Sequence, residues 1–256
     1  MTDTARVGGL RVEVDVAPAV RQRRLTVAFR VFLLVPHVVV LWFLGAASEV
    51  VTIVGYVAAV FTGRLPDFAW RYQSGYLGWL ARLFAYALFL TGDYPSLRWR
   101  PRVSPVVVHI PPPVTMNRWA VLFRPVLAVP AVLAVYVVGL GGAVVAVVEW
   151  VLVLTLGRTP RPVLQANAAV LRYYLRYQAY VLFMTPMYPR YLSGDDDLAD
   201  DARAAISWTR PLILTRGARV LVAAYILVGI PAYIAYTVST ADTSTRTTVL
   251  TSPWTP

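Results

Sequence analysis

Two ionisable side chains stand inside long apolar stretches of this sequence, where a charge is costly and often functional. Glu149 falls near the middle of 143–156, the second part of the apolar run 126–156, and His37 lies in the run 31–61. Proton or cation handling is one interpretation of Glu149, and proton relay is one interpretation of His37. The alternatives are structural: a His bonded within the protein, and a Glu that is neutral or paired with an arginine. The arginines considered for that pairing are Arg124, Arg172 and Arg176.

No other residue pattern predicts catalysis. The chain has no Cys, which excludes thiolate nucleophiles and Cys-bound metals, and it lacks the serine-nucleophile, zinc-protease, phosphate-loop and dinucleotide signatures. The acidic segment 195–201 lacks the spacing of an EF-hand and is interpreted as a solvated helix start. His109, in an alternating stretch, is interpreted as a surface residue. We predict no catalytic residue, metal or cofactor, and the sequence favours a non-enzyme without deciding the matter.

Eight arginines are the candidates for binding lipid headgroups. They flank the apolar runs or lie on two mixed helices, 68–90 and 163–184, which also carry aromatic residues. Arginine with Trp and Tyr on an amphipathic helix is typical of the headgroup region. These helices are therefore predicted to lie in the membrane interface, with a tilted crossing as the alternative. The eight are Arg30, Arg64, Arg71, Arg82, Arg124, Arg158, Arg172 and Arg176.

The composition indicates a membrane protein. Of the 256 residues, 58% are hydrophobic and 14% are charged, whereas about 25% are charged in a soluble domain. The two apolar runs exceed the length that predicts a membrane segment; two buried helical hairpins in a soluble protein are the alternative. The net charge is +11, and all 24 basic residues are Arg. Since no basic tract stands apart from the apolar segments, the charge indicates anionic lipid as a partner and excludes nucleic acid.

A tandem repeat organises the chain. Shifting the sequence by 94 residues aligns 11–95 with 105–189 and gives 29 identities in 85 positions. The identities include Arg, Pro, Tyr and Gly in one register, which apolar composition alone does not produce. Among them is a Gly-Arg-x-Pro motif, at 63–66 and 157–160. Its glycine suits the left-handed end of a helix, and its proline prevents the helix from continuing.

Each unit is predicted to have the same plan. A short strand, 11–18 or 105–112, precedes the apolar run, and the mixed helix follows Gly-Arg-x-Pro. Counted from Leu25, where its helix is expected to begin, to Phe61, the first run has 37 residues. These would make a helix of about 55 Å against a hydrocarbon core of about 30 Å. We therefore predict a membrane helical hairpin in each unit, with turns at 45–49 and 139–142, where small and polar residues gather. The short second arms of these hairpins either just span the membrane or re-enter it.

The predicted fold class is an all-α integral membrane protein of two such units, each with a short strand, a membrane hairpin and an interfacial helix, plus a C-terminal transmembrane helix. In this arrangement the arginine-rich loops share one side, which the positive-inside rule makes cytoplasmic. The protein is then a multi-pass protein of the cell membrane with a cytoplasmic N-terminus, an external C-terminal tail and parallel units. No cleavable signal peptide is predicted. The predicted divisions are a tail 1–10, units 11–99 and 105–193, an acidic then basic cytoplasmic loop 194–219, the helix 220–238 and a disordered Ser/Thr-rich tail 239–256.

The first unit carries a family resemblance. The stretches RLTVAFRVFLLVPHVVVLWFLG, AAVFTGRLPDF and YLGWLARLFAYALFLTGDYP resemble the actinobacterial membrane proteins of domain-of-unknown-function family 4389. The resemblance covers 11–95 well and 105–189 more loosely, since Ala131 replaces His37 in the second unit. It implies a membrane location and a tandem arrangement, and it brings no activity.

Three functions are compatible with the sequence. The favoured one is a non-catalytic scaffold or accessory subunit that binds anionic lipid headgroups through its arginines, or a protein partner in the membrane. The second is a transporter or channel component that uses Glu149 and the arginines within the membrane. The third is a membrane-embedded enzyme acting on lipids, for which the sequence offers no nucleophile.

Overall fold

The structure, a computed structural model, describes residues 12–17, 21–101, 103–190, 192 and 212–251. The repeat seen in the sequence is also a repeat of structure, since each helix of the second unit begins and ends 94 residues after its counterpart in the first. In chain order the elements are β1 (Glu13–Val16), α2 (Arg24–Ala28), α3 (Arg30–Thr62), α4 (Asp67–Ala87), β2 (Val106–His109), α5 (Arg118–Leu122), α6 (Arg124–Leu156), α7 (Arg161–Val181) and α8 (Arg216–Thr251).

Each apolar run forms one continuous helix of 33 residues, α3 or α6. The prediction of a turn within each run is wrong, because 45–49 and 139–142 both lie inside these helices. The hairpin of each unit is formed instead by the long helix and the mixed helix that follows it, α4 or α7, and its turn is the Gly-Arg-x-Pro motif. Gly63 and Gly157 have φ angles of 73° and 66°, in the left-handed region predicted for them.

Two of the small and polar residues that suggested a turn, Ser48 and Gly141, are contact points for a neighbouring helix. Ser48 of α3 donates a hydrogen bond of 2.7 Å to Gln73 of α4. Gly141 of α6 lies so close to α8 that a Cβ atom would be 1.8 Å from the carbonyl oxygen of Tyr225. A glycine within a helix costs only about 1 kcal/mol relative to alanine, which the contacts with a second helix offset.

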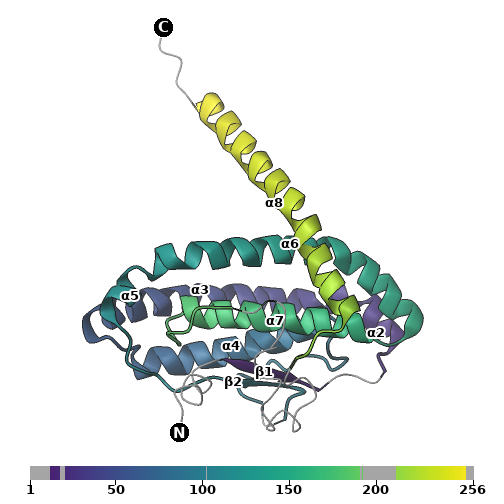
Figure 1. Ribbon diagram of the computed structural model, residues 1–256, viewed down its shortest axis with the longest axis horizontal. Coiled ribbons are helices and arrows are strands. Elements are labelled where there is room, and N and C mark those ends of the chain that lie inside the picture. Colours follow the sequence, from purple (N-terminus) through teal and green to yellow (C-terminus); the bar gives the residue numbers. More distant parts are fainter. Residues whose placement is uncertain (1–11, 18–20, 102, 191, 193–211, 252–256) are drawn as a thin grey trace.

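The elements form three layers (Figure 1). The long helices α3 and α6 make the outer layer, α4 and α7 make the middle layer, and the sheet of β1 and β2 makes the third. Twelve of the 21 residues of α4 are buried, and so are 12 of the 21 residues of α7. The mixed helices predicted to lie in the membrane interface therefore form the interior of the protein, because they pack against the long helices on one side and the sheet on the other.

An approximate two-fold axis relates the two units. β1 and β2 pair antiparallel, and Val14 pairs with Val108, its own counterpart in the repeat (108 − 14 = 94). The long helices consequently run in opposite directions: α3 ends beside α5, where α6 begins, and α6 ends beside α2, where α3 begins (Figure 1). The strands that open the units therefore pair with each other across the axis.

Reciprocal hydrogen bonds join the units at the two Gly-Arg-x-Pro motifs. Gln22 N donates to the carbonyl oxygen of Gly157 (2.9 Å), and Met116 N donates to the carbonyl oxygen of Gly63 (2.6 Å). Gln22 and Met116 are counterparts in the repeat, as are the two glycines. Each motif therefore ends the long helix of its own unit and accepts a hydrogen bond from the chain just before the first helix of the other unit.

Helix α8 is longer than the predicted segment 220–238. It extends from Arg216 to Thr251, so residues 239–251 of the predicted disordered tail are helical, because a helix that is already nucleated extends at low cost. Its first part packs against α6 and α7, and the rest projects away from the layers (Figure 1). The acidic segment 195–201 lies outside the described residues.

Candidate functional site

A buried arginine stands at the start of each long helix. Arg30 is 2% exposed and Arg124 is 3% exposed. Arg30 Nη1 donates to the carbonyl oxygen of Tyr86 (2.8 Å), and Arg124 Nη1 donates to that of Tyr180 (2.9 Å). Each guanidinium also lies over the ring of the same tyrosine, 4.3 and 4.4 Å from its centroid. The cations are stabilised by the carbonyl ends of α4 and α7 and by aromatic rings.

The same arginines face two phenylalanines with an uncommon backbone. Phe89 and Phe183 have φ angles of 58° and 59°, a region that costs about 1–2 kcal/mol for a residue with a Cβ atom. The guanidinium of Arg30 lies 4.6 Å from the ring centroid of Phe89, and that of Arg124 lies 5.1 Å from that of Phe183. Sequence analysis missed both residues. The signal that could have found them is that the two phenylalanines are identical in the repeat and come just after the mixed helices, where glycine is usual.

Glu149 is 4% exposed and is bonded to residues of two other helices. Asn167 Nδ2 of α7 donates to Glu149 Oε2 (2.9 Å) and to the carbonyl oxygen of Leu88 (3.0 Å). The Tyr225 hydroxyl of α8 contacts Glu149 Oε1, and it lies 2.8 Å from Asn167 Oδ1. The phenol has one proton and can donate it to only one of these two oxygens. A neutral Glu149 carboxyl group has a proton of its own to donate to the phenol oxygen, so all these polar atoms are then hydrogen-bonded. Glu149 thus joins α6, α7 and α8, with an amide and a phenol as partners in place of an arginine.

The first unit has a polar group at the same place but with other partners. Gln73 is the counterpart of Asn167 (167 − 73 = 94). Its Oε1 accepts from Ser48 Oγ (2.7 Å), and its Nε2 donates to Ser48 O and Thr52 Oγ1, both at 3.0 Å. Gly55 occupies the position of Glu149. Hydroxyl groups of α3 therefore satisfy the amide in the first unit, where a carboxyl group of α6 does so in the second.

His37 is fully buried, and both of its ring nitrogens have protein partners. Nε2 lies 3.0 Å from the carbonyl oxygen of Pro95, and Nδ1 lies 3.1 Å from the Tyr94 hydroxyl. The ring stacks on Trp79 with a centroid distance of 5.7 Å. Both ring nitrogens are therefore bonded within the protein, which supports the structural interpretation of this residue.

Two of the candidate arginines bind the strand of the other unit. Arg172 donates from Nε and Nη2 to the carbonyl oxygen of Val14, at 3.1 and 2.9 Å. Arg176 Nε donates to the carbonyl oxygen of Val12 (3.4 Å). Their exposed fractions are 4% and 7%. These side chains hold α7 against β1 in the interior.

The other candidate arginines divide by exposure. Arg82, at 8% exposed, donates to the carbonyl oxygen of Arg98 (2.9 Å). Arg64, Arg71 and Arg158 are exposed. Of the eight arginines predicted to meet lipid headgroups, the structure therefore leaves these three on the surface and places five inside the protein.

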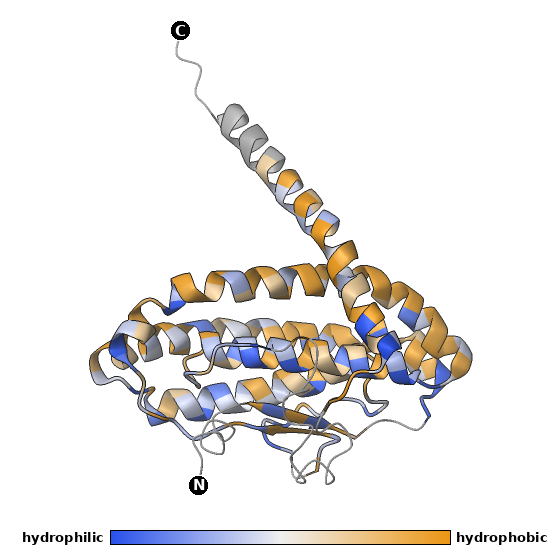
Figure 2. Ribbon diagram, in the orientation of Figure 1, coloured by the Kyte–Doolittle hydropathy of each residue, from blue (hydrophilic) through white to orange (hydrophobic). Residues whose placement is uncertain are grey.

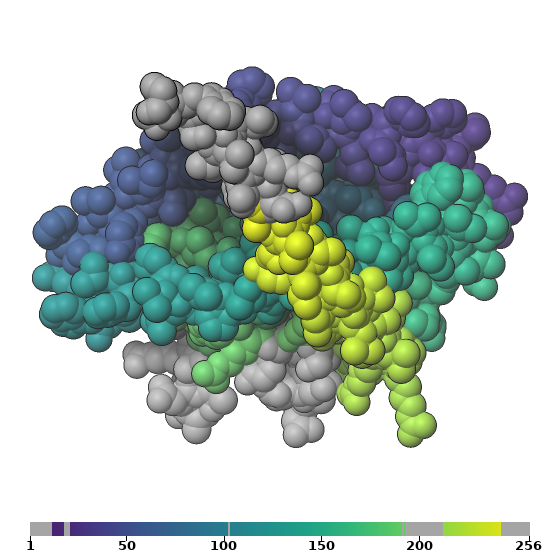
Figure 3. Space-filling view, turned by 90° about the horizontal axis from the view of Figure 1, so that it is seen from above, coloured from purple at the N-terminus to yellow at the C-terminus, as the bar shows by residue number. Residues whose placement is uncertain are grey.

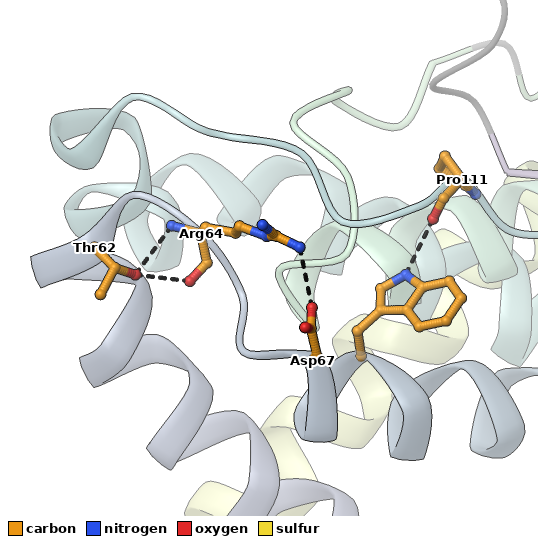
Figure 4. Close-up of polar contacts among 5 residues, drawn as sticks. Thr62, Arg64, Asp67 and Pro111 are labelled. Carbon is orange, nitrogen blue, oxygen red and sulfur yellow. Dashed lines mark hydrogen bonds and ion pairs between the residues drawn. The ribbon is translucent and has the colours of Figure 1, made fainter.

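The surface around Arg64 contains its own counter-charge (Figure 4). Arg64 Nη2 donates to Asp67 Oδ1 (3.0 Å), with the two side chains 50% and 66% exposed. Thr62 Oγ1 accepts from Arg64 N (3.2 Å) and donates to Arg64 O (2.9 Å). Trp70 Nε1 donates to the carbonyl oxygen of Pro111 (3.0 Å), which ties α4 to the chain that leads to α5.

The tyrosines of the middle layer are neutral packing groups. Burial, and then the neighbouring Tyr174, Tyr72 and Glu49, raise the pKa of Tyr76 to about 12. Burial also raises the pKa of Tyr86, while the Arg30 guanidinium opposes that rise. Both phenols keep their protons at neutral pH.

The described polar groups join helices to one another. In the part of the chain that the structure describes, no three His, Cys, Asp or Glu side chains gather where they could hold a metal ion. Three helices, 30–62, 124–156 and 216–241, are long and apolar enough to cross a membrane. The fold therefore defines an α-helical membrane protein built from an internal repeat.

Comparison with protein families agrees with this class. The sequence matches the family described as Domain of unknown function (DUF4389) twice, over residues 24–97 and 118–193. The two matches cover more than half of the chain and coincide with the two structural units, so the chain belongs to the DUF4389 family and contains its domain as a tandem repeat. No curated protein and no solved structure gives a significant match.

Proposed function

We propose that this protein is a non-catalytic membrane scaffold that lies along one leaflet of the bilayer through α3 and α6 and is anchored by α8. The observation that carries the proposal is an apolar face that stays exposed along the whole of each long helix. On α3 the exposed large apolar side chains are Val31, Phe32, Val35, Val38, Val39, Trp42, Phe43, Val50, Ile53, Val54, Val57 and Phe61. On α6 they are Val126, Leu127, Val129, Leu133, Tyr136, Val144, Val147, Val148, Val151, Leu152 and Leu156.

These two faces lie on the same side of the molecule. Seen from above, α3 and α6 both run along the long axis, and the described part of α8 lies over α6 (Figure 3). Apolar residues are concentrated on these three helices (Figure 2). Each long helix has 33 residues, or about 50 Å of length. A contiguous apolar surface of this size is typical of contact with lipid.

The sheet, on the opposite side of the molecule, turns polar side chains outward beside Val107, which is 46% exposed. Val14 and Val16 of the sheet face the interior and are buried, while Glu13, Asp15 and His109 alternate with the inward positions. The sheet lies below the middle of the long helices (Figure 1). If α3 and α6 crossed the bilayer, these charged groups and the strand edges would lie at its mid-depth, where they are unstable. With α3 and α6 in the plane of the membrane, the sheet faces water.

Helix α8 then supplies the anchor. Residues 230–241 are mostly exposed and project on the side away from the sheet. These 12 residues (241 − 230 + 1) span about 18 Å, close to one leaflet of a hydrocarbon core of about 30 Å. With α3 and α6 in the near leaflet, α8 crosses the far one.

The distribution of arginine supports one orientation. Of the 24 basic residues, only Arg246 follows the apolar segment of α8. The positive-inside rule therefore favours a cytoplasmic body and an external C-terminus. In this orientation the N-terminus is cytoplasmic and the C-terminal tail is external, as the sequence predicts. Helix α8 is then the crossing helix, where the sequence predicts several.

Because the chain has no Cys, single cysteines can be introduced for depth measurement. Spin labels at four exposed positions of α3, Val31, Val39, Val50 and Phe61, are placed in nanodiscs, and their depth is measured from collisions with oxygen and a water-soluble nickel chelate. A helix in the plane of the membrane gives four similar depths. A crossing helix gives headgroup depths at its ends and the bilayer centre in the middle, which would overturn the proposal. Labels along 230–238 of α8 are the control and should differ in depth.

A transport role is the second candidate, and one observation favours it: the Glu149 carboxyl group is buried between three helices. Proton and cation flux into liposomes that contain the purified protein tests it. Flux that the wild type supports and Glu149→Gln abolishes would establish transport. A wild-type rate equal to that of empty liposomes would remove the candidate.

A further inference from the structure

The two ends of the long axis have equivalent corners with unequal charge. At one end the chain before α2 meets the end of α6 and the start of α7; at the other, the chain before α5 meets the end of α3 and the start of α4 (Figure 1). Four positions at each corner correspond through the 94-residue repeat. The Arg24 corner has Arg23, Arg24, Arg158 and Arg161, and the Arg64 corner has Asn117, Arg118, Arg64 and Asp67.

Hydrogen bonds between the units build the Arg24 corner. Gln22 N donates to Gly157 O (2.9 Å), which places Arg23 and Arg24 beside the second Gly-Arg-x-Pro motif. Arg24 Nη2 donates to the carbonyl oxygen of Thr155 (3.1 Å), in the last turn of α6. The corner is therefore a fixed meeting point of three chain segments.

The Arg64 corner neutralises most of its own charge. Asp67 accepts from Arg64 at 3.0 Å, as Figure 4 shows. The Asn117 side chain is neutral and caps α5 by accepting from Trp119 N (2.9 Å). With two arginines and one aspartate among the four positions, the net charge is +1 (2 − 1).

The Arg24 corner has no such compensation. Arg161 replaces Asp67 and Arg23 replaces Asn117, so its four positions carry a net charge of +4. All four side chains are exposed, and within the described part of the chain none of them forms an ion pair. Arginines gathered at one corner without counter-charge repel one another unless an anion lies among them. Their planar guanidinium groups match the geometry of a phosphate.

We propose that the Arg24 corner binds the phosphate of one anionic phospholipid at the rim of the near leaflet. The site rests on the proposed function, because it needs α6 to lie along that leaflet. The exposed apolar face of α6 ends at Leu156, next to the corner. A lipid can therefore place its acyl chains against α6 while its phosphate meets the arginines. The Arg64 corner, with its internal counter-charge, binds no such lipid.

The repeat supplies a matched pair of variants. Arg161→Asp introduces at the Arg24 corner an aspartate equivalent to Asp67, which pairs with Arg64. Asp67→Arg introduces at the Arg64 corner an arginine equivalent to Arg161. Retained lipid is counted by native mass spectrometry of protein released from nanodiscs of phosphatidylcholine with phosphatidylglycerol. Wild type should retain one phosphatidylglycerol, and Asp67→Arg should retain a second. Arg161→Asp should bind the lipid about tenfold more weakly, because it replaces an attractive charge with a repulsive one. Arg158→Gln, which introduces no acid, should weaken retention by a smaller factor.

Three outcomes would overturn the site: equal retention in the wild type and Arg161→Asp, no gain in Asp67→Arg, or competition by millimolar inorganic phosphate, which would identify a site for a free anion. The spin-label depths along α3, measured in pure phosphatidylcholine, do not depend on this corner. An in-plane profile with unchanged lipid retention would contradict the site alone, whereas a crossing profile would contradict the proposed function.

Discussion

The interiors of the two units differ in what their polar side chains hold together. In the first unit, Gln73 bonds to Ser48 and Thr52, so the network stays within the α3–α4 hairpin. In the second unit, Asn167 bonds to Glu149, and Tyr225 of α8 completes the network. One backbone plan therefore serves two tasks: a self-contained hairpin and a hairpin that binds an additional helix.

The difference extends to the surface of the long helices. Gly141 allows the backbone of α8 to contact α6, and Gly229 of α8 makes the reciprocal contact, since a Cβ there would be 1.9 Å from Val137 O. The first-unit counterpart of Gly141 is Ala47, which is exposed. Small residues at a helix crossing allow this close approach in membranes. A few substitutions between the repeats, with the backbone unchanged, thus determine where the anchor attaches.

The feature that the units share should give the largest effect on stability. Arg30→Met and Arg124→Met should each lower the free energy of unfolding by about 3–5 kcal/mol, because each leaves buried carbonyl groups without a donor, at about 1–3 kcal/mol apiece. Unfolding in detergent, followed by circular dichroism, measures the loss. Arg71→Met, at an exposed position, is the control and should change stability by less than about 0.5 kcal/mol. A stable Arg30→Met beside an unstable Arg124→Met would break the equivalence of the units.

The docking of α8 should be the next most sensitive feature. Gly141→Ala should destabilise by about 1–3 kcal/mol, because the new methyl group overlaps the backbone of α8. The adjacent Gly142→Ala has nothing within 4 Å of its new Cβ and should stabilise by up to about 1 kcal/mol through helix propensity. The opposite signs are measured by the same unfolding experiment. Equal effects of the two variants would mean that α8 does not contact α6 at this point.

The chemical state of Glu149 can be tested by a smaller effect. Glu149→Gln keeps a donor and an acceptor for Tyr225 and Asn167, as a neutral carboxyl group does, so it should change stability by less than about 1 kcal/mol. Glu149→Ala removes both and should cost about 1–3 kcal/mol. A Gln variant as unstable as the Ala variant would indicate an ionised carboxylate.

The smallest effect on stability is expected at the Arg64 corner. Asp67→Asn removes an ion pair whose side chains are 50% and 66% exposed, and such a pair contributes about 0–1 kcal/mol. Its midpoint of thermal unfolding should therefore stay within about 3 °C of the wild type. A much larger decrease would show that Asp67 supports the hairpin turn itself and is more than a surface counter-charge.

The local features of the fold could be predicted from the sequence. The short strands, the left-handed glycines and the 94-residue repeat all follow from residue type and short-range spacing, and the structure confirms them. The strands, Glu13–Val16 and Val106–His109, are shorter than the predicted 11–18 and 105–112. The candidate sites were predicted less well. Glu149 and His37 were identified as buried groups, but their partners Asn167, Tyr225 and Pro95 lie 18 to 76 residues away along the chain, and no local pattern encodes such contacts.

The sequence by itself determined that the chain is apolar, duplicated and helical, and that each long helix ends at Gly-Arg-x-Pro. These properties depend on interactions within a few residues of one another. Only the tertiary structure decided that Ser48 and Gly141 are helix contacts and that Arg172 holds a strand of the other unit. A small or polar residue is compatible with a turn and with a helix contact, so the neighbouring helix determines which of the two it becomes.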